Sequence, residues 1–243
     1  MPPTFTERNL FFAWSTYTGD YETYAHWYDV EHIPQVMDTT GMVGAQRFLL
    51  GDTKNLPGVV PVDLGHLALY EIEGSSAGFR EEVKQMLMSG AMVLPDFMNQ
   101  PFDALFLAPV SEPQYGASWD KADDSTALDD RHLFFAWCKP AADAVADGTF
   151  ARWYDGEHIP QILGATGMLR AQRFESSPVK PLPGVRVPDL GHLALYEIAG
   201  DPSAFREEIK QMLISGEMSI PDFMNPPFSS MFMRPASPFH AAT

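Results

Sequence analysis

The chain has 243 residues, of which 45% are hydrophobic, enough to form one large core or two small ones. Its 16 Lys and Arg residues against 32 Asp and Glu residues give a formal net charge of −16. So acidic a surface repels phosphate groups, and we therefore expect neither nucleic acid nor an anionic membrane as a partner.

In chain order, the first elements alternate as strand, helix, strand, strand, helix and strand. An apolar run rich in aromatic residues predicts a strand at residues 9–16. Asp20 can cap the helix that follows, Pro34 should bend it and Gly41 should end it. Further strands are predicted at residues 42–50, 65–73 and 102–110, and a second helix at 76–90. This order is the ferredoxin-like βαββαβ pattern.

The whole pattern then occurs a second time. His32 recurs as His158 and Gly41 as Gly167, at a constant offset of 126 residues that needs no gap through to Pro235. We therefore expect a first module at residues 1–110, a polar and acidic linker at 111–130, and a second module at 131–243. Two copies are too few for a solenoid and indicate a fused homodimer with internal pseudo-twofold symmetry. The two sheets should pack against each other and bury their apolar faces, while a homodimer of the fused chain stays open.

One segment of each module resembles a known family. Trp27-Tyr28-Asp29-Val30-Glu31-His32-Ile33-Pro34, repeated at residues 153–160, resembles the signature helix of the EthD-like branch of the dimeric α+β barrel superfamily. The resemblance implies an α+β fold in which two ferredoxin-like modules form a single-chain dimeric α+β barrel. The superfamily includes cyclases, isomerases, cofactor-free monooxygenases and haem-handling enzymes, so it does not fix the function. The strand at residues 65–70 further resembles the histidine-bearing strand of plant olivetolic acid cyclase.

Histidines and tyrosines are the candidate catalytic groups, because imidazole titrates near neutral pH and phenols can donate protons. They occur at matching positions of the two modules: His32, His66 and Tyr70 in the first, and His158, His192 and Tyr196 in the second. Each histidine has a structural alternative, in which it bonds a buried carbonyl or another polar group.

Other residues are candidates for substrate binding: Trp14, Tyr28 and Arg47 with their repeats Trp137, Tyr154 and Arg173. The aromatic residues could instead be core. The arginines could instead pair with the helix carboxylates Asp29, Glu31, Asp155 and Glu157, which otherwise could orient an imidazole. Three positions become arginine in the second module: His26, Gly44 and Val60 correspond to Arg152, Arg170 and Arg186. Either the two clefts bind differently or the surface has drifted.

No cofactor is expected, because the sequence has no HExxH-type or cysteine-rich metal motif and no glycine-rich phosphate loop. Cys138 is the only cysteine, which excludes an intrachain disulfide and suits a reducing compartment. The sequence shows no leader-like start and no stretch of about 18 apolar residues, so a soluble cytoplasmic protein is expected.

These features predict a cofactor-independent lyase, isomerase or cyclase acting on a small hydrophobic, aromatic or polyketide-like substrate. Two alternatives stay open: a cofactor-free monooxygenase on the same scaffold, and a non-catalytic small-molecule-binding protein. A cleft that holds a histidine would favour an enzyme, and a fully packed space would favour the binding protein.

Overall fold

The computed structural model describes residues 8–62, 64–119 and 126–242. The elements of the first half, in chain order, are β1 (Arg8–Ser15), α1 (Tyr21–His26), the π-helical turn η1 (Trp27–His32), α2 (Ile33–Met37), β2 (Met42–Leu50), β3 (Val60–Pro61), β4 (His66–Glu73), α3 (Ser76–Ser89), β5 (Asp103–Pro109) and β6 (Gln114–Tyr115). All four long strands and both helices that the sequence predicts are present.

The second half repeats this order after a short helix. Its elements are α4 (Thr126–Asp129), β7 (His132–Cys138), α5 (Ala142–Ala146), α6 (Thr149–Trp153), the π-helical turn η3 (Tyr154–His158), α7 (Ile159–Leu163), β8 (Met168–Ser176), β9 (His192–Ile198), α8 (Pro202–Ser215), the 3-10 turn η4 (Asp222–Met224), β10 (Ser229–Pro235) and β11 (His240–Ala241). The three extra residues of the second copy lie around α5, which has no counterpart in the first half.

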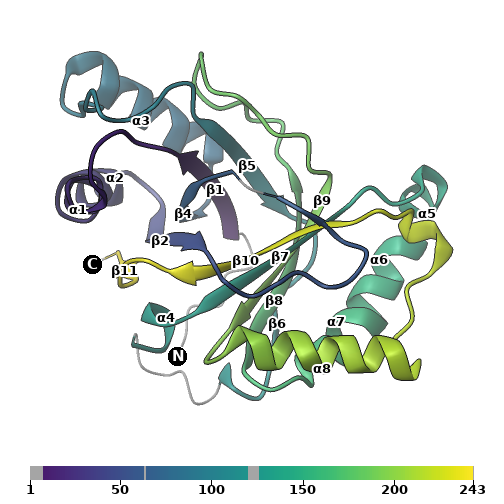
Figure 1. Ribbon diagram of the computed structural model, residues 1–243. Helices are drawn as coiled ribbons and strands as arrows, with labels where there is room; N and C mark the ends of the chain where they lie inside the picture. Colours follow the sequence, from purple (N-terminus) through teal and green to yellow (C-terminus); the bar gives the residue numbers. More distant parts are fainter. Residues whose placement is uncertain (1–7, 63, 120–125, 243) are drawn as a thin grey trace.

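Eight long antiparallel strands close into one barrel, in the order β2-β4-β1-β5-β8-β9-β7-β10 with β10 returning to β2. The two halves join at both seams, where Leu107 faces Ser176 and Met233 faces Leu50. The shared core expected from the repeat is therefore present. The sheets additionally pair edge to edge, which leaves neither half with an open long edge. Figure 1 shows α1, α2 and α3 of the first half on one side of the barrel and α5 to α8 of the second half on the other.

The barrel interior is filled by alternate residues from strands of both halves. Leu10, Phe12 and Trp14 of β1 point inward and meet Leu133, Phe135 and Trp137 of β7. Phe12 and Phe135 contact edge to face, with ring centroids 5.3 Å apart. All these side chains are at most 2% exposed, so the period-two pattern of the strands builds one dry core.

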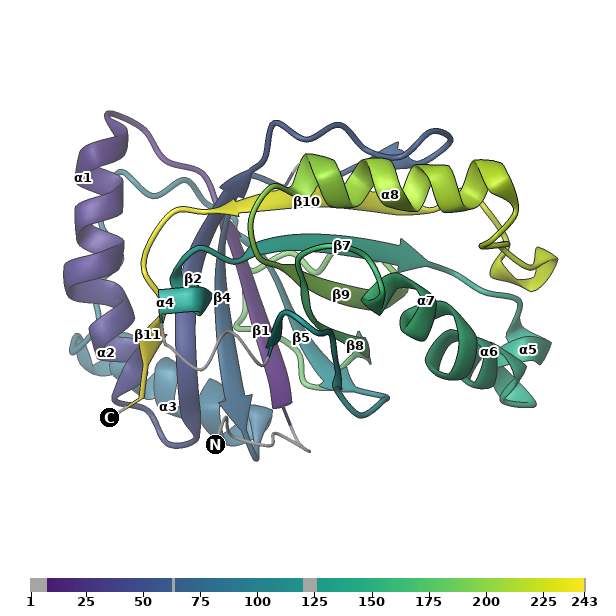
Figure 2. The ribbon, with the colours of Figure 1, turned by 90° about the horizontal axis from the view of Figure 1, so that it is seen from below.

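Each half has one further apolar cluster, which lies between its sheet and its helices. Tyr24, Val36 and Phe79 belong to the first of these clusters, and Phe150, Ile162 and Phe205 to the second. Figure 2 shows α1 and α8 on either side of the barrel. The three-layer arrangement of helix, barrel and helix leaves two equivalent places for a cleft between helices and sheet.

The first helix departs from the predicted continuous helix at residues 20–41. Asp20 does cap it, accepting a hydrogen bond of 2.8 Å from the Thr23 amide. Its middle, however, is a π-helical turn, and its last helical residue is Met37. Gly41 lies beyond the helix end with φ of +82° and turns the chain into β2.

The expected linker does more than connect the halves. Within it, β6 pairs with β8 of the second half, and β11 at the other end of the chain pairs with β2 of the first. The linker thus adds a short strand to the sheet of the second half, and the C-terminal segment adds one to the sheet of the first half. Residues 120–125 of the expected linker lie outside the described residues, and the module boundaries at 110 and 131 stay predictions. No helix of the described residues is long and apolar enough to span a membrane.

Candidate functional site

The π-helical turn decides where the signature histidines point. In an α-helix, residues five apart point to different sides, whereas the wider π-turn brings them to the same side. His32 accordingly stacks on Trp27, with ring centroids 4.6 Å apart and planes tilted by 19°. His158 stacks on Trp153 in the same way, at 4.6 Å and 22°.

Both of these imidazoles are enclosed. Burial lowers the pKa of His32 and of His158 to about 4, so both rings are neutral at neutral pH. Nδ1 of each ring is buried and has no hydrogen-bond partner within the protein. A buried nitrogen without a partner is costly in a purely structural role.

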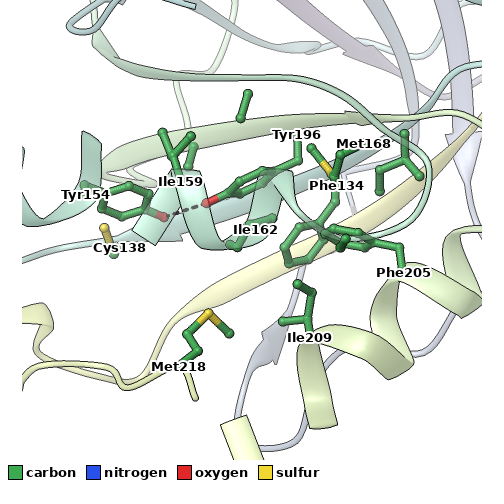
Figure 3. Packing of buried hydrophobic residues seen from close by; sticks show 14 of the residues in the cluster. Phe134, Cys138, Tyr154, Ile159, Ile162, Met168, Tyr196, Phe205, Ile209 and Met218 are labelled. Atoms are coloured by element: carbon green, nitrogen blue, oxygen red, sulfur yellow. Dashed lines mark hydrogen bonds between the residues drawn. The ribbon is translucent and has the colours of Figure 1, made fainter. Parts of the chain in front are cut away.

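A cavity of about 280 Å³ lies in front of His158, between the helices and the sheet of the second half. Its apolar wall comes from β7, α7, α8 and the segment before β10, and includes Phe134, Trp137, Ile162, Ile209, Leu213 and Phe228. Figure 3 shows part of this wall, with Ile162 on one side and Ile209 on the other. Ligand sites of proteins are typically about 300–1,000 Å³ and mostly apolar, so this cavity suits a molecule at the small end of that range.

The polar groups of the cavity are few and uncharged. The Tyr154 and Tyr196 hydroxyls lie 3.4 Å apart within hydrogen-bonding reach of each other, as the dashed line in Figure 3 marks. Burial raises the pKa of both phenols and raises that of the Cys138 thiol to about 12. With His158 neutral as well, the cavity presents one imidazole, two phenols, one thiol and the hydroxyls of Ser229 and Ser230, all without a formal charge.

The equivalent space of the first half is smaller, about 100 Å³. His32, Tyr28 and Trp14 line it as their repeats do in the second half, but Tyr70 does not. Beside it, Tyr24 and Ser15 share a hydrogen bond of 2.8 Å. Phe150 and Cys138 stand at the matching positions of the second half. The two cavities therefore share an equivalent histidine and tyrosine, His32 with Tyr28 and His158 with Tyr154, but they differ in volume.

Each cavity is covered by a loop from the opposite half. Leu56, Pro57 and Val59 of the first half line the second-half cavity, and Leu182 and Val185 do the same for the first-half cavity. The sequence signal for this role is the Leu-Pro-Gly triplet that both loops contain, and sequence analysis missed it.

Hydrogen bonds hold the covering loop of the first half against the second. Arg206 of α8 donates to the carbonyl oxygen of Lys54 at 3.0 Å, and the Asn55 side chain donates to the carbonyl oxygen of Ser230 at 3.0 Å. The amide of Val60 donates to the carbonyl oxygen of Phe228 at 2.8 Å. The second-half cavity is therefore a composite site that neither half can enclose alone.

The other predicted histidines lie outside both cavities. His66 opens β4, and its ring lies among those of Tyr17, Tyr21 and Tyr24. His192 opens β9 beside Phe150, with ring centroids 5.1 Å apart. The structure thus brings His158, Tyr154 and Tyr196 together, and leaves His192 out of the group.

The strand arginines are held by carboxylates of the signature helix. Arg47 binds Asp29 through two hydrogen bonds of 2.7 and 2.6 Å, and Arg173 binds Asp155 through two of 2.6 and 2.7 Å. Neither arginine lines the cavity at His158 or the smaller cavity at His32. Glu31 and Glu157 are exposed. The geometry therefore supports pairing of the arginines with the helix carboxylates rather than substrate binding.

The three positions that become arginine in the second half line neither cavity. Arg152 bonds the helix start at Asp147 and Thr149, and Arg186 forms an exposed ion pair with Asp103. Arg170 instead is buried among charged side chains at one end of the barrel interior. Within the described part of the chain, no group of three or more His, Cys, Asp or Glu side chains could hold a metal ion.

No family model and no curated protein matches the sequence, so the likeness to the EthD-like branch stays a prediction. Solved structures do resemble the fold. A protein provisionally assigned as a monooxygenase from Fusobacterium nucleatum matches with a TM-score of 0.57 and 9% identity, covering 97% of this chain and 94% of its own. An anthrone oxidase-like protein matches with a TM-score of 0.57 and 11% identity, covering 97% and 93%.

Chlorite dismutase from Candidatus Nitrospira defluvii, solved in complex with imidazole, matches with a TM-score of 0.51 and 12% identity, covering 94% of this chain and 91% of its own. Identities this low carry the fold and not the chemistry. Together with the closed eight-stranded barrel, these matches show that the chain has the dimeric α+β barrel fold, with both halves of the barrel on one polypeptide.

Proposed function

We propose that the second-half cavity binds a small neutral molecule, aromatic or polyketide-like, and that His158, Tyr154 and Tyr196 move protons on it without a cofactor. The reaction class is that of a lyase, isomerase or cyclase. The observation that carries the proposal is an apolar cavity of about 280 Å³ with a neutral, partly unsatisfied imidazole in its wall.

The character of the wall supports the choice of substrate. Its few polar groups are all uncharged at neutral pH, so a charged ligand would lose its hydration without meeting an opposite charge. A flat apolar molecule gains from leaving water and from contact with the rings of Phe134 and Phe228.

The polar groups suit proton transfer next to a carbonyl. A neutral imidazole is in the form that accepts a proton, and a phenol with a raised pKa stays protonated and can donate a hydrogen bond to a carbonyl oxygen. In this scheme His158 takes a proton from the carbon next to the carbonyl, a tyrosine hydroxyl stabilises the enolate oxygen, and the proton returns to carbon or oxygen. Exclusion of water strengthens each of these contacts.

Exchange of carbon-bound protons with solvent tests this chemistry without knowledge of the natural substrate. The probe is 1-tetralone in D₂O, and proton NMR follows loss of the signal next to the carbonyl. We expect wild-type protein to accelerate the exchange and His158→Gln to reduce the acceleration by about 10²- to 10⁴-fold. His32→Gln is the matched control, because it changes the same signature in the smaller cavity, and it should retain the wild-type rate.

Cofactor-free oxygenation of a similar substrate is the second candidate. The observation that favours it is that neighbours of the same fold are assigned as a monooxygenase and as anthrone oxidase-like. An oxygen electrode with anthrone as the probe distinguishes the candidates: oxygen uptake that depends on the second-half cavity supports oxygenation. Binding of both probes without exchange or oxygen uptake would leave a non-catalytic binding protein.

A further inference from the structure

A closed ring of alternating charges lies buried at one end of the barrel interior. Arg8 and Arg131 hold equivalent places in the two halves, as do Glu71 and Glu197. The successive N···O distances around the ring are 2.7 Å from Arg8 to Glu71, 3.0 Å from Glu71 to Arg131, 2.7 Å from Arg131 to Glu197 and 2.9 Å from Glu197 to Arg8. Two positive and two negative charges make this ring neutral.

Arg170 adds a fifth charge that breaks the symmetry. It donates two hydrogen bonds of 2.9 Å to Glu197 and lies 3.7 Å from Glu71. The matching position in the first half is Gly44, where the ring of Phe239 occupies the space that a side chain would need. In the described part of the chain, the three arginines form ion pairs with these two glutamates alone, which leaves one positive charge uncompensated.

The excess charge is shielded from water. The five charged side chains are at most 4% exposed. Aromatic rings lie against the guanidinium groups, with Trp119 at 5.3 Å from Arg170 and Phe239 at 5.0 Å from Arg131. Aromatic faces relieve part of the cost of a buried cation, but they do not neutralise it.

Two guanidinium nitrogens of this cluster have no acceptor. Nη1 of Arg8 and Nη2 of Arg131 are buried and lack a hydrogen-bond partner. Burial and the repulsion from Arg8 lower the pKa of Arg170, although two glutamates face it. A cluster with one surplus positive charge and two idle donors has the properties of an anion site.

We propose that the buried cluster of Arg8, Arg131, Arg170, Glu71 and Glu197 binds one small monovalent inorganic anion of the size of chloride. One surplus charge calls for one negative charge, and the unpartnered Nη atoms supply its donors. Because the five charged side chains are at most 4% exposed, the site suits a small anion better than a large one. This site is separate from the cavity at His158 and independent of the chemistry proposed there.

Thermal unfolding at constant ionic strength tests the proposal on the intact chain. Chloride replaces gluconate, which is too large for the site, while sodium and total ionic strength stay fixed. We expect the unfolding midpoint of wild-type protein to rise with chloride and to saturate, and ³⁵Cl NMR of the folded protein to show excess line broadening that bromide reverses.

Two variants separate this site from general salt effects. Arg170→Met removes the surplus charge but keeps the aliphatic stem, and it should abolish both the chloride-dependent rise and the broadening. Arg186→Val is the matched control, because it also restores the first-half residue type but at an exposed position, and it should behave as wild type. Chloride dependence that persists in Arg170→Met overturns the proposal. So does wild-type protein with neither saturable stabilisation nor broadening, whatever the folding of the variant.

Discussion

The stacked imidazoles make the stability of the protein sensitive to mild acid. His32 and His158 have a pKa of about 4 in the folded chain, against an ordinary value near 6.5 when the chain is unfolded. As the pH falls from 7 to 5, the unfolded state takes up protons that the folded state refuses, so folding loses free energy. Each buried histidine should cost about 2 kcal/mol at pH 5 relative to pH 7. The loss should level off only below pH 4, where both states are protonated.

Urea unfolding at pH 7, 6 and 5 measures this loss. Replacing either histidine by glutamine should remove about 2 kcal/mol of the loss between pH 7 and pH 5, and the double replacement about twice as much. Burial also lowers the pKa of His132 and His192, which account for the remainder of the loss. This pH window lies above the range where carboxylates such as Glu71 and Glu197 take up protons, because neighbouring arginines outweigh burial and keep their pKa low. His26 is exposed, and His26→Gln should leave the pH dependence as in wild type. If the double variant loses as much stability as wild type between pH 7 and 5, the burial argument is wrong.

Three further changes probe the covering loop, the barrel core and the broken symmetry. Leu56→Trp should fill the second-half cavity and weaken binding of 1-tetralone by at least tenfold in a fluorescence titration, whereas Leu182→Trp over the other cavity should not; equal effects would contradict the composite site. Phe135→Ala should cost about 3–5 kcal/mol in urea unfolding, and a cost below 1 kcal/mol would argue against one shared core. Gly44→Ala should cost about 1–3 kcal/mol of unfolding free energy because the added methyl group meets the ring of Phe239, and adding Phe239→Ala should relieve the clash. Stability that is unchanged in the single and the double variant would argue against this packing.

Most features of the barrel can be predicted from the sequence. The unbroken offset between the halves predicts two equal units, and the alternation along strands such as Leu10–Phe12–Trp14 predicts an apolar face on each sheet. Together they require a common core, which is what the structure has. The pairing of the sheets at both edges was not predictable, because hydrophobic alternation fixes which face is buried and not which edges meet.

Details of the site depend on longer-range geometry. A period of 3.6 residues places Tyr28, His32 and Val36 on one stripe, but the π-turn that aligns His32 with Trp27 has no simple sequence signal. The apolar strand around His66 made this residue a candidate for catalysis. In the structure His66 is the first residue of its strand, beside tyrosines, and it does not line the cavity. The covering loops and the buried arginines were missed because both cross from one half to the other. The repeat could have revealed the arginines, since Arg8 and Arg131 occupy matching positions where the first strand of each half begins.

The central claim is that the second-half cavity, and not its smaller counterpart, is the ligand site. A crystal of the protein soaked with 1-tetralone tests it most directly. We expect electron density for the ring system between Ile162 of α7 and Ile209 of α8, under Leu56, with the ketone oxygen toward the hydroxyl of Tyr154 or Tyr196. Density in the first-half cavity, or none in either cavity at a concentration that saturates the fluorescence titration, would contradict it.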